Sequence, residues 1–220
     1  MQVETNNSYN ITKEMTAVKS AEEETEKPVI PIDTQIKHPL QNSWTLWYLE
    51  NDRKKDWKQN LKEIISFDTV EDFWSLYNHI KAASELKQGC DYCLFKKGIQ
   101  PMWEDAANLE GGRWLISLEK KQREVELDNY WLEIMLCMIG ETFDEYSDEI
   151  NGATVNVRTK IDKIGLWTAN GDKSKSEAIL SIGKKIKERL RIHSKQQIVY
   201  QLHRDTQVKS GSNVKSSYYL

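Results

Sequence analysis

Strand-like and helix-like patterns alternate along the middle of this 220-residue chain. Apolar residues three or four positions apart predict helices over 70–80, 128–139 and 175–190. Ser174 and Glu177, at the start of the last of these, have the spacing of a capping box. Strands are predicted over 44–50, 112–118, 152–159, 163–168 and 197–203. This order predicts an α+β domain, in which helices cover one face of a mainly antiparallel sheet.

Composition divides the chain into one domain with two polar ends. Residues 1–36 hold seven acidic and three basic residues, a net charge of −4, so the rest of the chain carries +1 of the total of −3. A segment this acidic and poor in aromatic residues cannot bury enough apolar surface to fold. We therefore predict a disordered arm over 1–35, a single domain over 36–205 and a mobile tail over 206–220.

Composition also limits the compartment and the partners. No apolar run approaches the roughly 18 residues of a membrane span. The N-terminus lacks a secretory signal, and three cysteines do not make a disulfide framework, so we expect a reducing compartment. The cytoplasm is the expected location, with the nucleus and RNA granules as further ones. A domain near neutrality excludes DNA or long nucleic acid held by bulk charge, so any phosphate site must be small and local.

Two of the eight tryptophans stand in polar surroundings. Trp57 lies in Lys-Lys-Asp-Trp-Lys-Gln-Asn, and Trp103 lies in Gln-Pro-Met-Trp-Glu-Asp. Leucine or isoleucine would fill a core equally well, so indole at such positions indicates a flat aromatic surface that is used for its face. Trp57 can also be interpreted as an exposed residue that merely covers an edge of the core.

The pair Trp103 and Glu104 indicates recognition of guanine. A carboxylate accepts hydrogen bonds only, so it can receive two from the N1–H and N2 amino edge of the base while the neighbouring indole stacks on the ring. A 7-methylated guanine carries a positive charge in its ring. Two indoles that sandwich it would add cation–π attraction to stacking, and Trp57 is the candidate for the second indole.

Cations beside one predicted hairpin are candidates for binding phosphates. Arg158 faces away from the apolar residues of its strand, and Lys163 lies across a short turn from it, so both can reach one polyphosphate chain. Arg113, after the Gly111-Gly112 turn, is a candidate for steadying a loop or Glu104. Each of these residues alone is more often a solvated surface charge. Their combination with the two tryptophans is what favours a site.

The predicted helix over 128–139 is apolar on two sides. Leu132 and Leu136 form a pair on a different side from the face that holds Trp131, Ile134, Met135, Met138 and Ile139. Helices that are apolar all round are usually buried, which is the simpler interpretation. The alternative is a surface groove that receives a helix of a partner protein.

Other chemistry finds little support in the sequence. Cys90 and Cys93 have the C-x-x-C spacing, but no second pair lies at zinc-ligand spacing, and Cys137 is in an apolar helix. No phosphate-binding loop, nucleophile elbow or paired-histidine motif is present. An enzyme that hydrolyses nucleotides would need a carboxylate cluster for metal ions, and we find none. We predict no catalytic centre, no metal site and no cofactor.

Several motifs resemble the eukaryotic translation initiation factor 4E family, whose members bind the cap of messenger RNA. They are residues 38–42 (His-Pro-Leu-Gln-Asn), 67–74 (Phe-Asp-Thr-Val-Glu-Asp-Phe-Trp), 101–105 (Pro-Met-Trp-Glu-Asp), 111–114 (Gly-Gly-Arg-Trp) and 209–212 (Lys-Ser-Gly-Ser). The resemblance spans about residues 36–220. It implies a curved eight-stranded antiparallel sheet backed by three long helices, with the cap in the concave face.

The resemblance also implies a role for each candidate residue of the cap site. Trp57 and Trp103 would stack on 7-methylguanine, Glu104 would bind its N1 and N2 edge, and Trp167 would lie by the N7-methyl group. Arg158 and Lys163 would bind the phosphates, and Arg113 would support them. Ile161 is bulkier than the small residue expected in this turn. This difference would affect the affinity for the phosphates and not the recognition of guanine. The loop over 120–126 and the arm diverge most from the family.

On the convex side, the resemblance implies a surface for the scaffold initiation factor 4G and the 4E-binding repressor proteins. The matching positions are His38, Pro39, Val70, Trp74, Leu132, Glu133, Leu136 and Gly140. The resemblance thereby favours the groove at Leu132 and Leu136.

Ser212 is a candidate phosphorylation site. We predict a non-enzymatic factor that binds the 7-methylguanosine 5′ cap of messenger RNA and recruits the scaffold. The alternative is a cap-binding repressor paralogue with a different partner.

Overall fold

The computed structural model describes residues 36–208 and 216–220. The predicted arm over 1–35 and the phosphorylation candidate Ser212 lie outside these residues. Residues 37–220 group into one compact unit. Within the described part of this unit, no helix has both the length and the apolar character that crossing a membrane requires.

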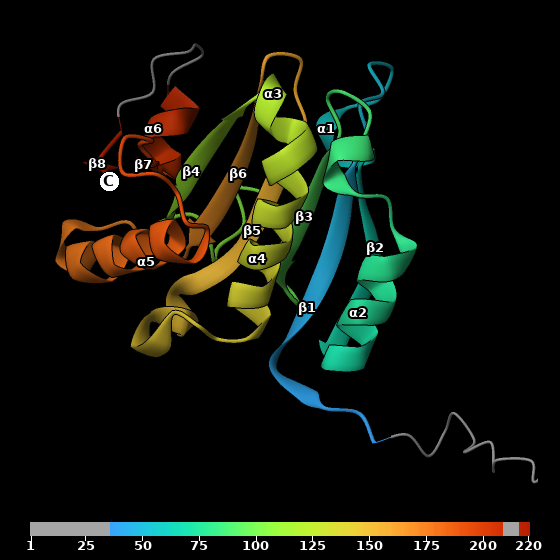
Figure 1. Cartoon of the computed structure of the whole chain (residues 1–220), viewed down its shortest axis with the longest axis horizontal. Helices are drawn as coiled ribbons and strands as arrows, with labels where there is room; N and C mark the ends of the chain where they lie inside the picture. Colours follow the sequence, from blue (N-terminus) through green and yellow to red (C-terminus); the bar gives the residue numbers. More distant parts are fainter. Residues whose placement is uncertain (1–35, 209–215) are drawn as a thin grey trace, which may run out of the picture. The chain divides into compact units, whose positions relative to one another are not determined.

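An eight-stranded antiparallel sheet forms the centre of the domain (Figure 1). Its strands are β1 (Pro39–Leu49), β2 (Leu61–Thr69), β3 (Asp91–Lys96), β4 (Gly112–Glu119), β5 (Ile150–Asn156), β6 (Ile161–Thr168), β7 (Val199–Leu202) and β8 (Tyr218–Tyr219). The strand order is β2-β1-β3-β5-β6-β4-β7-β8, which leaves β2 and β8 as the edges. The curved sheet with three long helices is the predicted fold, which is confirmed.

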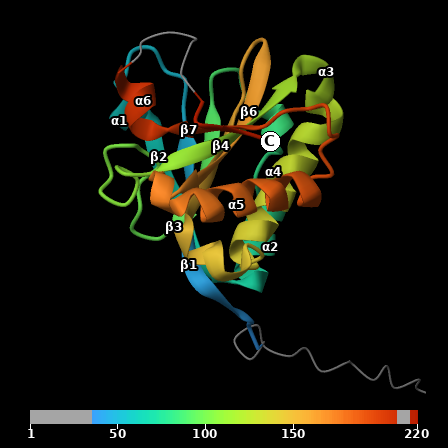
Figure 2. The same ribbon diagram turned by 90° about the vertical axis from the view of Figure 1, so that its left-hand side faces the viewer.

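Three long helices cover one face of the sheet and lie in front of it in Figure 1. They are α2 (Val70–His79), α4 (Asp128–Ile139) and α5 (Ser176–Arg189). Shorter elements are α1 (Trp57–Asn60), α3 (Lys120–Gln122), α6 (His203–Val208), the 3-10 turns η2 (Ala83–Glu85), η4 (Asp144–Glu149) and η5 (Lys173–Lys175), and the π-helical turn η3 (Arg123–Leu127). Figure 2 looks towards the β8 edge, with α5 crossing close to the viewer.

The core lies between the sheet and the helices. Trp44, Trp114 and Trp131 are buried in it, and the Trp114 Nε1–H donates to the carbonyl oxygen of Ile179 in α5 at 2.9 Å. Residues of β5 alternate between the two faces of the sheet, because successive side chains of a strand point in opposite directions. Ala153, Val155 and Val157 belong to the core, so Thr154, Asn156 and Arg158 are directed to the face without helices.

The sequence patterns did not predict three of the strands, β2, β3 and β8, and two of these have a physical reason in their burial. In β2 the register shifts opposite Leu46 and Trp47, and Ile64 and Ile65 are both about half exposed, so apolar and polar residues do not alternate. In β3 five of six residues are buried, because the strand is central and covered on both faces. Neither pattern is the period of two that a half-buried strand displays.

Two local predictions are wrong. Ser174 does not cap α5: the N-cap of α5 is Lys175, without a side-chain hydrogen bond, and Asp172 instead accepts from the Ser174 amide to start η5. Residues 120–126 are not a loop, since α3 and η3 run without a break in helical conformation into α4.

The prediction of a mobile tail over 206–220 is wrong for its last residues. Strand β8 pairs with β7, and Ile198 and Leu220 exchange backbone hydrogen bonds of 3.0 and 3.1 Å. The side chains of Tyr218 and Leu220 pack against the core. Without β8, the edge of β7 would leave a row of unpaired backbone groups, and pairing with β8 satisfies them. The C-terminus therefore lies at this edge of the sheet (Figure 2).

Candidate ligand-binding cleft and partner surface

A cleft of about 1100 Å³ opens on the face of the sheet without helices. All seven residues predicted for cap binding line it: Trp57, Trp103, Glu104, Arg113, Arg158, Lys163 and Trp167. They come from α1, from the loop between β3 and β4, and from β4, β6 and the β5–β6 turn. The structure thus brings together residues that are more than a hundred positions apart. The role of each toward a ligand stays a prediction.

Trp57 is the first residue of the one-turn helix α1. Asp56 is its N-cap: the Asp56 carboxylate accepts from the Gln59 amide at 2.7 Å, and the Gln59 side chain accepts from the Asp56 amide at 3.1 Å. The buried Asn60 donates to the carbonyl oxygen of Asp52 at 2.9 Å. These bonds hold the segment while the Trp57 side chain stays 45% exposed at the cleft.

Trp103 and Glu104 occupy a loop that buried amides hold in place. Asn108, which is fully buried, donates to the carbonyl oxygens of Gln100 and Met102 at 2.9 and 2.8 Å. The Asp105 carboxylate accepts from the amides of Gln100 and Ala107, both at 2.9 Å. The backbone on both sides of Trp103 and Glu104 is therefore fixed, which gives the loop the rigidity that a binding site requires.

Trp167 forms part of the floor of the cleft and is packed on several sides. Its ring meets Phe95 edge-on at 5.3 Å between centroids and lies at 4.2 Å from the ring of the buried His203. The Arg113 guanidinium carbon is 5.9 Å from the Trp167 centroid, within reach of a cation–π contact. This packing determines which edge of the indole faces the cleft.

Arg113 is a cation without a counter-charge in the described residues 36–208 and 216–220. No carboxylate there lies within ion-pair distance of its guanidinium, and its buried Nε has no hydrogen-bond partner. Burial lowers the pKa of Arg113. A buried, unpaired guanidinium beside an open cleft is stabilised by an anion, such as a phosphate, that binds there.

Arg158 forms an ion pair with Asp91. Its two terminal nitrogens bind both carboxylate oxygens of Asp91, with Nη2 at 3.0 Å from Oδ2, and this carboxylate raises the pKa of Arg158. Lys163 has its pKa lowered by burial and by the neighbouring Arg113 and Arg158. Among the cations that line the cleft, four form no ion pair within the described residues: Arg113, Lys163, Lys58 and Lys160. Of these, only Arg113 and Lys163 lie on strands of the sheet. Sequence patterns carried no signal for Asp91, because its strand was not predicted.

The burial of His203 predicts a loss of stability in acid. Burial, followed by the charge of Arg113, lowers the pKa of His203 to about 3. An unfolded histidine takes up its proton near pH 6.5 while folded His203 stays neutral down to about pH 3, so the free energy of unfolding should fall by about 1.4 kcal/mol per pH unit between these two values. Urea unfolding at pH 7.5 and 5.5 measures this loss. His203→Phe keeps a ring against Trp167 and should remove it, whereas an equal loss in this variant would contradict the prediction.

The residues predicted for partner binding lie at the surface of the helical side. His38 and Pro39 are exposed, Val70 is 37% and Trp74 38% exposed, Leu132, Glu133 and Leu136 are half-buried, and Gly140 is exposed at the end of α4. The His38 amide donates to Glu71 at 2.9 Å, which attaches this segment to the first turn of α2. The side chains of Leu132 and Leu136 are neither fully buried nor fully exposed, as expected for residues that form one wall of a groove.

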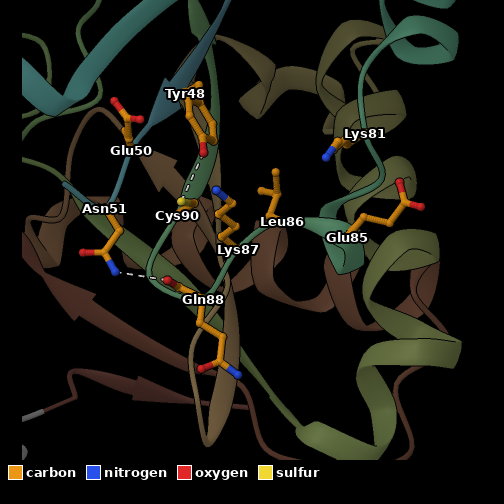
Figure 3. Close-up of a pocket in the computed structure, with 9 residues that line it drawn as sticks. All are labelled: Tyr48, Glu50, Asn51, Lys81, Glu85, Leu86, Lys87, Gln88 and Cys90. Atoms are coloured by element: carbon orange, nitrogen blue, oxygen red, sulfur yellow. Dashed lines mark hydrogen bonds between the residues drawn. The ribbon is translucent and has the colours of Figure 1, made fainter.

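A smaller cavity of about 230 Å³ lies beside the ends of β1 and η2 (Figure 3). The Tyr48 hydroxyl donates to Cys90 Sγ at 3.1 Å, and the Asn51 amide donates to the carbonyl oxygen of Gln88 (Figure 3). Cys93 lines the large cleft instead. The two cysteines of the C-x-x-C sequence thus open on different cavities and do not form a shared site.

A family model described as eukaryotic initiation factor 4E matches residues 39–218. The chain belongs to this family. Among its relatives, the initiation factor 4E of Aplysia californica is 58% identical over 198 residues, which are 90% of this chain and 91% of the relative.

Solved structures of the initiation factor 4E family share this fold. The 4E-3 protein of Ascaris suum in complex with an m2,2,7G cap has a TM-score of 0.79 and 50% identity, over 84% of this chain and 99% of that one. The 4E-3 protein of C. elegans in complex with the 4E-binding protein Mextli and a cap analog has a TM-score of 0.77 and 48% identity, over 84% of this chain and all of that one.

Proposed function

We infer that this protein binds the 7-methylguanosine 5′ cap of messenger RNA and recruits a scaffold factor for cap-dependent translation initiation. The observation that carries this inference is the cleft itself, which gathers two indoles, one carboxylate and unpaired cations. These are the groups that a methylated purine with a polyphosphate chain requires. The family and the cap complexes of its relatives support the same conclusion.

We propose that the indoles of Trp57 and Trp103 stack on the two faces of the methylated base. Stacking contributes about 1–3 kcal/mol per base, and a cation–π contact adds about 0.5–2 kcal/mol. Glu104 accepts the hydrogen bonds of the N1 and N2 edge, and Trp167 contacts the methyl group from the floor of the cleft. The base is thereby recognised by its charge, its edge and its methyl group together.

The phosphates follow the base along the cleft toward the unpaired cations. Arg113 and Lys163 supply positive charge, and Arg158 presents the guanidinium that Asp91 holds in position. Charge-assisted hydrogen bonds to phosphate are about twice as strong as neutral ones. We propose that Arg113 contributes more here than the supporting role expected from sequence, because no carboxylate in the described residues neutralises it.

The helical side recruits the protein partners. Val70, Trp74, Leu132 and Leu136 offer apolar surface on α2 and α4 that a partner helix can cover. The scaffold factor 4G and the 4E-binding repressor proteins are the proposed partners. Since the cleft and this surface lie on opposite faces of the sheet, the protein can hold the cap and a partner at the same time. We propose that it does so in the cytoplasm.

Selectivity for the 7-methyl group tests this function. Titration of the intrinsic tryptophan fluorescence with 7-methylated and unmethylated cap dinucleotides should give at least about tenfold tighter binding of the methylated one, because only its ring is cationic. Equal affinities would refute the cation–π sandwich. A pull-down with a scaffold-factor peptide then tests recruitment, and cap binding without peptide capture would favour a repressor paralogue.

A further inference from the structure

A buried ion pair lies behind the turn that carries the phosphate-binding residues. The Arg123 Nε and Nη2 atoms donate to the two carboxylate oxygens of Asp162, at 2.5 and 2.7 Å. The Asp162 side chain is completely buried and that of Arg123 is 12% exposed. Neither residue lines the cleft. Burying two charges is costly unless geometry and hydrogen bonding are good, so such a pair fixes the relative position of the two segments it joins.

The same pair holds the backbone of Arg158 at both ends. Asp162 Oδ1 accepts from the Arg158 amide at 2.8 Å, and Arg123 Nη2 also donates to the Arg158 carbonyl oxygen. Asp91 holds the side chain of Arg158 from β3. Asp162 itself is the neighbour of Lys163 in β6. Arg123, which does not line the cleft, thus contacts the backbone of Arg158 and the residue next to Lys163.

The local helix geometry brings Arg123 to the turn. Arg123 is the first residue of the π-helical turn η3, between α3 and α4. Such turns are rare and often occur at functional sites. In Figure 1 the start of this helix and the β5–β6 turn stand side by side at the same end of the domain. Arginine suits this position better than lysine, because only a planar fork can bind both oxygens of a carboxylate and a carbonyl group together.

We propose that Arg123 is a positioning residue for the phosphate part of the cap site, acting through Asp162 and the backbone of Arg158. This inference rests on the proposed cap-binding function. It separates the site into two parts. The base is held by Trp57, Trp103 and Glu104, to none of which Arg123 is hydrogen-bonded. The phosphates are held by Arg113 of β4 together with the β5–β6 hairpin, whose shape Arg123 maintains.

The test compares ligands that differ only in phosphate number. In the full chain, Arg123→Lys keeps the charge near Asp162 but loses the fork, and the double variant Arg123→Gln with Asp162→Asn leaves no buried charge unpaired. Affinities for 7-methylguanosine and its mono-, di- and triphosphate are measured by fluorescence quenching. Arg189→Lys is the matched control, because Arg189 pairs with Glu133 at 2.7 Å far from the hairpin.

We expect both Arg123 variants to bind the nucleoside like the wild type and the triphosphate about tenfold more weakly, the equivalent of one charge-assisted hydrogen bond. The gain in affinity from mono- to triphosphate should shrink in these variants and persist in the control. An equal loss for nucleoside and triphosphate would make Arg123 a general stability residue, and unchanged affinities would remove its role; either result overturns the proposal. Failure of the cap-binding function would differ from both, since the wild type itself would then bind no methylated nucleotide selectively.

Discussion

Replacing Trp103 by alanine is expected to weaken cap binding by about 2–4 kcal/mol, roughly 30- to 1,000-fold. The variant loses one face of the proposed sandwich, and the neighbouring Glu104 loses the ring that brings the base edge to it. Trp57→Ala should have an effect of similar size. Fluorescence is reduced by these substitutions, so isothermal titration with a 7-methylated cap analogue is the appropriate measurement.

Conservative variants separate stacking from packing. Trp103→Phe and Trp57→Phe keep an aromatic face and should retain part of the affinity, because phenylalanine offers a smaller and weaker cation–π surface than tryptophan. Trp57 is 45% exposed, so Trp57→Ala should leave the melting temperature nearly unchanged. Normal cap affinity in either alanine variant would show that the corresponding indole is a surface residue outside the site.

Replacing Trp74 by alanine is expected to abolish capture of the scaffold factor and of the competing repressors. An aromatic anchor in a helix-receiving groove typically contributes at least about 2 kcal/mol to binding. The Trp74 ring meets the rings of the buried Phe73 and of Tyr77 edge-on, with centroid distances of 5.1 and 5.9 Å. It is nevertheless 38% exposed, so it can contact a partner while these two rings pack against it. Pull-down with a scaffold peptide measures the loss.

Thermal melting and cap titration are the controls for Trp74. Cap affinity should stay near the wild-type value, because Trp74 does not line the cleft. A lost partner with an unchanged melting temperature supports the groove. If the melting temperature and the cap affinity fall together, Trp74 is a core residue, and the partner surface must lie elsewhere.

Much of this protein is predictable from the sequence because its patterns are local. The three long helices display their apolar stripes within a few turns, and α4 has the predicted bounds. The residues around Trp57, Trp103 and Glu104 combine types that together match guanine. The family is indicated by five short motifs, of which residues 101–105 include Trp103 and Glu104. For these features, neighbours within about ten residues hold the information.

The predictions that are wrong concern segments in which the tertiary environment overrides the local sequence pattern. Ser174 and Glu177 have capping-box spacing, but Asp172, two residues before Ser174, is the N-cap of the 3-10 turn η5 that precedes α5. The last residues look like a tail in composition, yet the free edge of β7 pairs with them. Strand β3 is buried on both faces and has no alternation to detect.

The sequence by itself determined the helices, the α+β class and the residue types of the proposed cap site. Only the tertiary structure decided which charged residues in and behind the cleft form ion pairs with each other. Asp91 and Arg158 are 67 residues apart, and Arg123 and Asp162 are 39 apart. No periodicity links such residues, because their meeting depends on which strands are neighbours in the sheet and in what register. That pairing leaves Arg113 and Lys163 as the strand cations of the cleft without a carboxylate partner in the described residues, and it joins Arg123 to the β5–β6 turn beside the cleft.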